Sequence, residues 1–387
     1  MKAVKIANDI YWVGAIDWSM REFHGYETSC GSTYNAYLII DEKITLIDTV
    51  KAGFEGELIE RISSVIDPAK IDYIVSSHVE PDHSGSIPVV AALCPEATII
   101  TSSPNGLKGL TARYGEQKYQ AVKGGDTLSI GKRTLQFVTT PMLHWPDSMV
   151  TYCPEEKILF SNDAFGQHFS STGRFDDEND LAVVMREAKK YYANILMPYG
   201  KQAHNALAAL STLDIKTIAT GHGIIWRSHI LTILAAYERW SVGEVEERAV
   251  VVFDSMWHST EMIAREIADA FAEKGIPASF YDLKKNPMAD IVADMFTAKY
   301  LAVGSPTLNN QMLPTVAKFL CYIKGLNPQH HEAFAFGSFG WGGQSIALVE
   351  DELKSMGMAI CLEKIRVANV PNRDELQKIR EKVMSIE

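Results

Sequence analysis

Four potential metal ligands lie within six residues of this chain, in the segment 78–83 with the sequence H-V-E-P-D-H. The segment follows the apolar run 71–75, which is typical of a buried strand, and two small serines. Three further residues of the same ligand types stand at long spacing: His144, Asp163 and His222. Imidazole and carboxylate groups together suit iron, manganese and zinc. Seven such groups are too many for one ion and enough for two.

The order of residues within the segment predicts two separate ligand sets. His78 and Glu80 are two positions apart, so on an extended strand end their side chains point the same way, whereas the adjacent Asp82 and His83 point elsewhere. Asp163 is the expected bridge, because a carboxylate has two oxygens and an imidazole has no equivalent. The predicted ligands of the first ion are His78, Glu80 and His144, and those of the second are Asp82, His83 and His222.

Glu80 favours iron over zinc. Zinc hydrolases generally use histidine-rich sites, which leave the metal-bound water a good nucleophile. A carboxylate at position 80 adds negative charge, which stabilises the higher oxidation state of a redox metal. We therefore predict a di-iron centre. The alternative is a zinc-dependent hydrolase, and the structural alternative is that these are ordinary solvated turn residues.

A second kind of site is indicated by three loops in the second half of the chain. The loop 254–261 offers serine and threonine hydroxyls in front of a predicted helix, and such a helix start binds a phosphate without a cationic side chain. The loops 304–310 and 337–343 follow other strands of the same predicted sheet, where ligands bind at the carboxyl edge. Together they predict a flavin mononucleotide (FMN) pocket. The expected contacts are Ser255, Met256, Trp257, His258, Ser259, Thr260, Ser305, Pro306, Thr307, Leu308, Asn309, Asn310, Ser338, Phe339, Gly340, Trp341 and Gly342.

The elements that must position these residues differ between the two halves. The first half has short β-rich runs such as 33–40 and 44–47 with few helices between them, which indicates mixed α/β structure with two sheets. From about Arg248, strands alternate with helices, which indicates a doubly wound parallel sheet of about five strands. We place the domains at residues 1–247 and 248–387.

Composition limits the classes of partner. The formal net charge is −11, which argues against nucleic acid and against an anionic membrane surface, because both need clustered Lys and Arg. No apolar run reaches the length of a membrane span, and no signal peptide is visible. The five cysteines form no C-x-x-C pair. That pattern suits a reducing cytoplasm and excludes a fused rubredoxin or zinc ribbon.

Taken together, these motifs resemble those of a known family. The H-x-E-x-D-H cluster, the later His, Asp and Gly-His-Gly, the S-M-W-x-S-T-E loop and the S-P-T-L-N-N loop are similar to those of the flavodiiron proteins (A-type flavoproteins) over essentially the whole chain. The resemblance implies a metallo-β-lactamase-like αββα sandwich followed by a flavodoxin-like domain. It implies reduction of dioxygen to water, of nitric oxide to nitrous oxide, or both.

The resemblance also implies site residues and partners. It carries over all seven predicted ligands as iron ligands, and it places His24, His168 and Tyr191 around the substrate pocket. It implies a head-to-tail homodimer, or a dimer of such dimers, with the flavin of one subunit beside the di-iron centre of the other. This chain resembles the two-domain class, so an external electron donor such as rubredoxin is expected.

Overall fold

The computed structural model describes residues 1–386, which divide into two compact units. The first unit comprises Met1–Tyr191 and Lys201–Glu238, and the second comprises Tyr192–Gly200 and the residues from Arg239 onward. The chain therefore passes between the units three times. The domain boundary that we place between residues 247 and 248 from the sequence stays a prediction.

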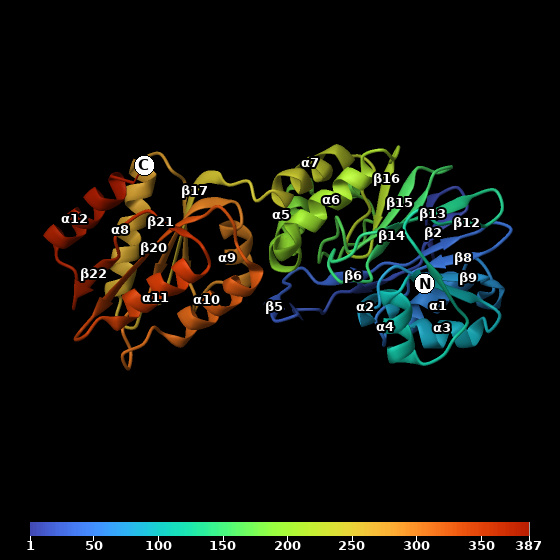
Figure 1. The fold of residues 1–387 in the computed structure, drawn as a ribbon, viewed down its shortest axis with the longest axis horizontal. Coiled ribbons are helices and arrows are strands. Elements are labelled where there is room, and N and C mark those ends of the chain that lie inside the picture. Colours follow the sequence, from blue (N-terminus) through green and yellow to red (C-terminus); the bar gives the residue numbers. More distant parts are fainter. Residues whose placement is uncertain (387) are drawn as a thin grey trace. The chain divides into compact units, whose positions relative to one another are not determined.

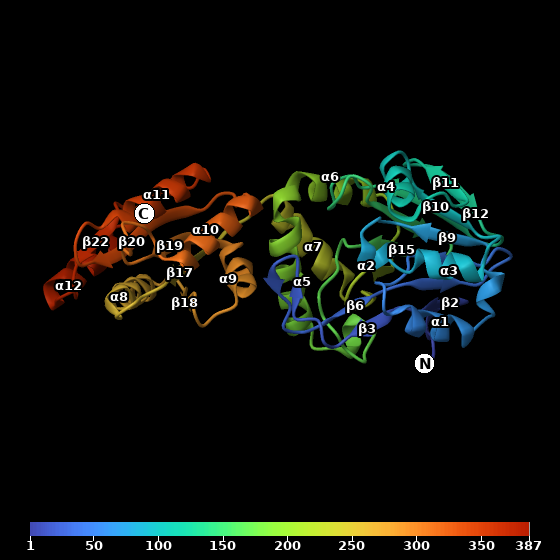
Figure 2. The same cartoon turned by 90° about the horizontal axis from the view of Figure 1, so that it is seen from below.

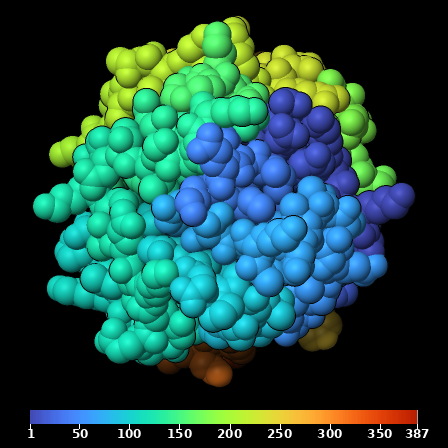
Figure 3. Space-filling model, turned by 90° about the vertical axis from the view of Figure 1, so that its right-hand side faces the viewer, coloured from blue at the N-terminus to red at the C-terminus, as the bar shows by residue number. Residues whose placement is uncertain are grey.

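Two sheets form the centre of the first unit. The larger has the strand order β1-β2-β7-β8-β9-β10-β11, and the smaller has the order β12-β13-β14-β15-β16. The strands of the larger sheet are β1 (Val4–Ala7), β2 (Ile10–Trp12), β7 (Tyr37–Ile39), β8 (Thr45–Ile47), β9 (Tyr73–Ser76), β10 (Thr98–Ser102) and β11 (Tyr119–Val122). Those of the smaller sheet are β12 (Thr127–Ser129), β13 (Thr134–Thr139), β14 (Met149–Cys153), β15 (Ile158–Asn162) and β16 (Thr217–Thr220). Figure 3 views a face built mainly from the first half of the chain, coloured blue to green.

Helices cover the outer sides of these two sheets. Figures 1 and 2 show α1, α3 and α4 beside the larger sheet and α5, α6 and α7 beside the smaller one. The α-helices are α1 (Glu55–Ser63), α2 (Pro81–Ser84), α3 (Ile87–Leu93), α4 (Asn105–Tyr114), α5 (Leu181–Tyr191), α6 (Gly200–Leu210) and α7 (Ile230–Ser241), and two 3₁₀ turns are η1 (Pro68–Lys70) and η2 (Asp176–Glu178).

The alternation of side chains along the strands creates two cores. Leu46 and Ile74 belong to the core under the helices α1, α3 and α4. Their neighbours Ile47 and Val75 belong to the core between the two sheets. Successive residues of a strand point to opposite faces, so a strand that is apolar throughout is buried on both faces. The αββα sandwich predicted for this part of the chain is confirmed.

The β-rich run 33–40 forms two short strands rather than one continuous strand. It divides into β6 (Ser32–Tyr34), which pairs with β3 (Ala15–Asp17), and β7 in the larger sheet. Asn35 lies at the break. Its backbone N–H donates a 2.9 Å hydrogen bond to Gly221 O, and its side chain donates a 2.9 Å hydrogen bond to Thr220 O. These bonds take Asn35 out of the sheet ladder and bring its neighbours to the loop that carries His222.

The second unit contains a parallel sheet with the order β18-β17-β19-β20, followed by β21 and β22, which both pair with β20. This gives five positions across the sheet, as predicted, in the order typical of flavodoxin-like folds. The strands are β17 (Glu246–Phe253), β18 (Ala278–Asp282), β19 (Ala298–Gly304), β20 (Glu332–Phe339), β21 (Ala359–Ile360) and β22 (Ile365–Ala368). The helices are α8 (Ser259–Glu273), α9 (Met288–Met295), α10 (Pro314–Leu326), α11 (Gln344–Ser355) and α12 (Arg373–Met384).

One segment of this unit comes from the middle of the chain. Residues Tyr192–Leu196 form a π-helix, and Met197–Tyr199 form a 3₁₀ turn. The Tyr192 ring stacks on Phe296 at 5.4 Å, and Asn194 accepts a hydrogen bond from the Tyr322 hydroxyl at 2.9 Å. No pattern in the sequence indicates this insertion. None of the helices in residues 1–386 is long and apolar enough to cross a membrane.

Candidate functional site

The six-residue ligand segment changes backbone conformation halfway along. Strand β9 ends at Ser76, and Glu80 still has an extended backbone, with φ −60° and ψ 140°. Pro81 then begins the short helix α2, which contains Asp82 and His83. Proline is favoured in a first helical turn because its fixed φ suits the helix. The extended part and the helical part therefore direct their side chains differently, as the sequence predicts.

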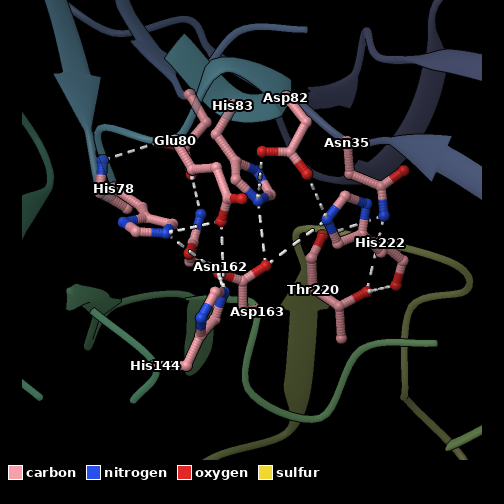
Figure 4. Close-up of polar contacts among 12 residues, drawn as sticks. Asn35, His78, Glu80, Asp82, His83, His144, Asn162, Asp163, Thr220 and His222 are labelled. Carbon is pink, nitrogen blue, oxygen red and sulfur yellow. Dashed lines mark hydrogen bonds and ion pairs between the residues drawn. The ribbon is translucent and has the colours of Figure 1, made fainter. Parts of the chain in front are cut away.

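The first ligand group surrounds one carboxylate oxygen. Glu80 Oε2 lies 3.2 Å from His78 Nε2 and 3.3 Å from His144 Nε2. His144 lies in the loop after β13, and its Nε2 is also 3.5 Å from Asp163 Oδ2. All four side chains are buried. The structure thus brings together the three residues predicted for the first ion (Figure 4).

The second ligand group lies on the other side of Asp163. Asp82 Oδ2 is 3.2 Å from His222 Nε2, and Asp163 Oδ1 is 2.9 Å from His83 Nε2 and 3.5 Å from His222 Nε2. One oxygen of Asp163 therefore faces each group, which is the arrangement that a bridging ligand needs (Figure 4). Two sets of ligand atoms lie close enough to share an ion: His78, His144 and Asp163, and Asp82, His83 and His222.

Several buried polar atoms of this cluster have no hydrogen-bond partner within residues 1–386. They include both oxygens of Asp82, Oδ2 of Asp163 and Nε2 of His222. Burying such groups without a partner costs free energy, roughly 1–3 kcal/mol for a neutral group and more for a charged one. All of them face the space between the ligands, and a bound cation would satisfy them. The donor set of four imidazoles and three carboxylates fits two iron ions.

The electrostatics of the cluster also favour bound cations. Burial disfavours the charged form of His78, but hydrogen bonds to Asp147 and Glu80 outweigh burial and raise its pKa to about 10. At His83 and His144, burial also disfavours the charged ring, but the charges and hydrogen bonds of the neighbouring carboxylates favour it more strongly. They raise the pKa of each histidine to about 10. The neighbouring carboxylates thus stabilise the charged forms of three imidazoles in the cluster. A metal ion binds the deprotonated ligands and replaces the protons of these rings.

Residues outside the predicted set orient the ligands. Asp147 Oδ2 lies 3.0 Å from His78 Nδ1 and accepts a 2.7 Å hydrogen bond from the Val79 backbone. Thr33 O lies 2.6 Å from His222 Nδ1. A hydrogen bond at Nδ1 leaves the Nε2 lone pair free for a metal. The sequence contains no short motif that marks Asp147 or Thr33, since each meets its histidine only in the folded chain.

The three residues expected around the substrate pocket all lie at the cluster. His24 Nε2 is 2.5 Å from Glu80 Oε1, and the Tyr191 hydroxyl donates to Asp163 Oδ1 over 3.0 Å. His168 is buried, with its Nδ1 2.8 Å from Ser32 Oγ and its ring centroid 5.0 Å from that of His222. Burial and the nearby His222 hold the pKa of His168 well below its usual range, so its ring is neutral.

The predicted flavin loops meet at the carboxyl end of the second unit's sheet. A pocket of about 230 Å³ is lined by residues from the loops after β17, β19 and β20. Of the predicted contacts, Ser255, Met256, Trp257, Ser259, Pro306, Thr307, Ser338, Phe339 and Gly340 line it. His258, Thr260, Ser305, Leu308, Asn309, Asn310, Trp341 and Gly342 are not among its lining residues. Asn369 and Val370, which follow β22, also line the pocket and were missed, because their loop has no phosphate or ring-binding pattern.

The loop after β17 has the features of a phosphate site. The Ser255 hydroxyl is buried and has no hydrogen-bond partner in the described part of the chain. It precedes the 15-residue helix α8, whose N-terminal N–H groups favour an anion. The loop has no cationic residue of its own, but Lys284 from the loop after β18 reaches it, with Nζ 2.8 Å from Asp254 Oδ1. The donors present fit the phosphate of FMN.

Comparisons with known proteins agree with this architecture. The model of the ODP family beta lactamase matches residues 33–223, and the flavodoxin model matches residues 251–382. A nitric oxide reductase of Moorella thermoacetica is 43% identical over 98% of this chain and 96% of its own length. The solved rubredoxin oxygen:oxidoreductase of Desulfovibrio gigas is 42% identical over 100% of this chain and 98% of its own, with a TM-score of 0.97. The solved flavodiiron protein of Giardia intestinalis is 36% identical over 100% of this chain and 96% of its own, with a TM-score of 0.97.

The fold and the site define a class of two-domain oxidoreductases in which a metallo-β-lactamase-like domain precedes a flavodoxin domain. Within that class, the chain belongs to the flavodiiron protein family. The resemblance stated from the sequence motifs is confirmed.

Proposed function

We propose that this protein is a flavodiiron oxidoreductase, which reduces dioxygen to water, nitric oxide to nitrous oxide, or both, at a non-haem di-iron centre supplied with electrons by FMN. The observation that carries the proposal is the position of Asp163, whose two oxygens face the two ligand groups. The relatives named nitric oxide reductase and rubredoxin-oxygen oxidoreductase support it. The zinc hydrolase alternative is disfavoured by the three carboxylates and by the flavodoxin domain.

The assignment of residues is part of the proposal. His78, Glu80 and His144 would hold one iron, Asp82, His83 and His222 the other, and Asp163 would bridge them. Ser255 and the start of α8 would hold the flavin phosphate. The metal ligands are assigned to a domain of residues 1–247 and the flavin contacts to a domain of residues 248–387. The assignment of the metal ligands is supported by the buried oxygens and nitrogens of these groups that have no hydrogen-bond partner in the described residues.

The chemistry of the proposed reaction divides between the cofactors and the chain. When bound, reduced FMN and two ferrous ions supply four electrons, which is the number that dioxygen needs to become two waters. Because Asp163 faces both ligand groups, small molecules bound at the two groups would meet without a diffusive search. Tyr191 and His24 place an O–H and an N–H group next to Asp163 and Glu80, where they hold protons close to the ligand groups.

The proposal includes partners and location. We expect an external electron donor such as rubredoxin, and the name of the relative from Megalodesulfovibrio gigas supports that class of donor. We expect a head-to-tail homodimer or a dimer of dimers, in which the flavin of one subunit serves the metal centre of the other. A cytoplasmic location is proposed from the five unbridged cysteines.

The test is replacement of the proposed bridge. Asp163→Ala is expected to lose iron and both gas-reducing activities, because each ion loses a ligand, while FMN content stays at the wild-type level. The matched control is Asp177→Ala, which removes a surface carboxylate paired with Arg227. Iron, zinc and flavin are measured by elemental analysis and absorbance, and turnover by anaerobic reduction followed by separate oxygen and nitric oxide consumption. Full activity in Asp163→Ala, or two zinc ions in the wild type, would refute the proposal.

A further inference from the structure

The seven candidate ligands come from two different sheets. The segment 78–83 follows β9 of the larger sheet, whereas His144, Asp163 and His222 lie in loops that follow β13, β15 and β16 of the smaller sheet. Each of the two ligand groups combines side chains from both sheets. The apolar core between the sheets holds them together, but the hydrophobic effect is non-directional. Directional hydrogen bonds beside the ligands are needed to fix one sheet edge against the other.

One buried carboxylate makes such bonds between the two sheets. Asp48 directly follows β8 of the larger sheet and is only 4% exposed. Its Oδ1 accepts a 2.7 Å hydrogen bond from the Ser77 backbone N–H, and its Oδ2 accepts a 3.3 Å hydrogen bond from Asn162 Nδ2. Ser77 directly precedes the ligand His78, and Asn162 directly precedes Asp163. The two oxygens of Asp48 thus join a ligand loop of the larger sheet to the loop that carries the proposed bridge.

Asn162 extends this connection to a third ligand loop. It is the last residue of β15, and its carbonyl oxygen accepts a 2.6 Å hydrogen bond from the Gly221 backbone N–H. Gly221 directly precedes His222, in the loop after the parallel neighbour strand β16. Three successive hydrogen bonds therefore link the residues that stand immediately before three of the candidate ligands. Asp48 lies at the only carboxylate in this series, and it connects the larger sheet to the smaller one.

The residue after Asp48 holds the far end of the ligand segment. Thr49 donates two hydrogen bonds to His83 O, from its backbone N–H over 2.9 Å and from its Oγ1 over 2.6 Å. Thr49 is fully buried. Asp48 and Thr49 therefore contact both ends of the segment 77–83, which the break at Pro81 divides into an extended part and a helical part.

The backbone at Asp48 suits this position. Asp48 has φ 57° and Asn162 has φ 51°, so both strands end in a left-handed residue. Aspartate and asparagine tolerate this conformation better than other residues with a side chain. Both positions therefore carry a residue type that fits the backbone and also makes the hydrogen bond between the sheets.

We propose that Asp48 is a positioning residue, which fixes the loop of Asp163 against the loop of His78 and so keeps the two ligand groups in the arrangement that binds two ions. The inference rests on the proposed function for the identity of the ions, but not for the hydrogen bonds. The role depends on the hydrogen bonds of Asp48 and not on its negative charge. Asp48→Asn can keep both bonds, because Asn162 Oδ1 has no other partner within residues 1–386 and a half-turn of that amide makes it the acceptor.

The experiment compares Asp48→Ala and Asp48→Asn with the wild-type protein. The matched control is Asp9→Ala, because Asp9 is an aspartate of the same unit with φ 55°, in the turn before β2. It lies at the opposite edge of the larger sheet, since the first residue of β2 and the first residue of β8 both pair with Ile39. Asp9→Ala therefore carries the same backbone strain without a contact to the ligand loops.

Two measurements are made on the metal-free full-length proteins. The first is the affinity for Fe²⁺, from anaerobic titration against a competing chelator. The second is a crystal structure of each protein, in which the distance between His78 Nε2 and Asp163 Oδ2, 3.8 Å here, is compared. Thermal unfolding of the same samples reports global stability.

We expect Asp48→Ala to bind Fe²⁺ about 10–100-fold more weakly than the wild type, as is typical when a residue that orients metal ligands is lost. The distance between His78 Nε2 and Asp163 Oδ2 should change by about 0.5 Å or more, which is enough to disturb a binding site. Asp48→Asn should restore both quantities. Asp9→Ala should leave both at the wild-type values, although its thermal unfolding shows the cost of alanine at positive φ.

Equal Fe²⁺ affinities in the wild type and Asp48→Ala would overturn the proposal. So would a loss in Asp48→Asn as large as that in Asp48→Ala, because the charge of Asp48 and not its hydrogen bonds would then account for the effect. If Asp48→Ala does not fold, Asp48→Gly takes its place, since glycine adopts positive φ without strain. A wild-type protein that binds no Fe²⁺ would refute the proposed function alone, and the structures of the variants would then decide the role of Asp48.

Discussion

The Tyr191 hydroxyl donates a 3.0 Å hydrogen bond to Asp163 Oδ1, the oxygen that also lies 2.9 Å from His83 Nε2. The tyrosine is the last residue of helix α5, and the aspartate follows strand β15. The helix end therefore fixes the rotation of the carboxylate that faces both ligand groups. Burial and the charge of Asp163 raise the pKa of Tyr191 well above its usual range, so the hydroxyl keeps its proton and stays a donor.

Tyr191→Phe should weaken the centre without destroying it. The ring keeps its packing against His168, at 5.0 Å between centroids, and only the hydrogen bond is lost. Loss of one partner behind a metal ligand typically costs 10–100-fold in metal affinity or activity, and we expect about 10-fold in turnover with iron still bound. Steady-state gas consumption and iron analysis measure the two effects. The buried Tyr192, which follows it in the chain but packs on Phe296, provides the comparison Tyr192→Phe.

Asp147→Asn should lower iron affinity by about 10–100-fold. The carboxylate lies 3.0 Å from His78 Nδ1, and its negative charge makes the imidazole a stronger ligand at Nε2. An asparagine keeps a hydrogen-bond acceptor there but removes the charge. The effect is measured as the concentration of chelator that removes half of the iron. Asp177→Asn, a surface change of the same type, should leave that concentration unaltered, and an equal shift in both variants would exclude the role given to Asp147.

The grouping of the seven candidate ligands could be predicted from the sequence. Four of them lie in one hexapeptide, and the other three lie in loops that follow strands. Asp147 and Thr33 could not be predicted, since their contacts with His78 and His222 join positions 69 and 189 residues apart. Alternating strands and helices predicted the second sheet. The π-helical insertion could not be predicted, because its partners are distant in sequence.

Ser255→Ala should weaken FMN binding by about 1 kcal/mol, or roughly 5-fold, because the phosphate loses one hydroxyl donor. The hydroxyl is buried and lines the pocket, and the backbone donors at the start of α8 remain. Flavin release is followed by the recovery of FMN fluorescence on dilution. Iron content should not change, since the ligands lie in the other unit. Ser355→Ala, at an exposed position, is the control, and identical dissociation constants for both variants would contradict a phosphate contact at Ser255.

His331 should make the second unit less stable in acid. Its Nδ1 lies 2.7 Å from Ala298 O, and burial lowers its pKa in the folded protein below the ordinary value of 6.5. Below about pH 6.5 the unfolded chain therefore binds a proton that the folded chain does not. Stability contributed by the neutral ring is fully present above pH 6.5 and is lost as the pH falls towards the folded pKa. The slope from one such group is at most about 1.4 kcal/mol per pH unit.

His331→Asn removes this titration and keeps an N–H donor for Ala298 O. At pH 7 the variant should be somewhat less stable than the wild type, because packing around the ring is lost, and the difference should shrink as the pH falls to 5. Thermal unfolding at pH 7, 6 and 5, with FMN at one fixed concentration, measures it. His330→Asn is a close control, since His330 is exposed and has φ 64°, a conformation that asparagine tolerates. A difference between wild type and His331→Asn that is constant over this range would show that His331 is protonated equally in both states.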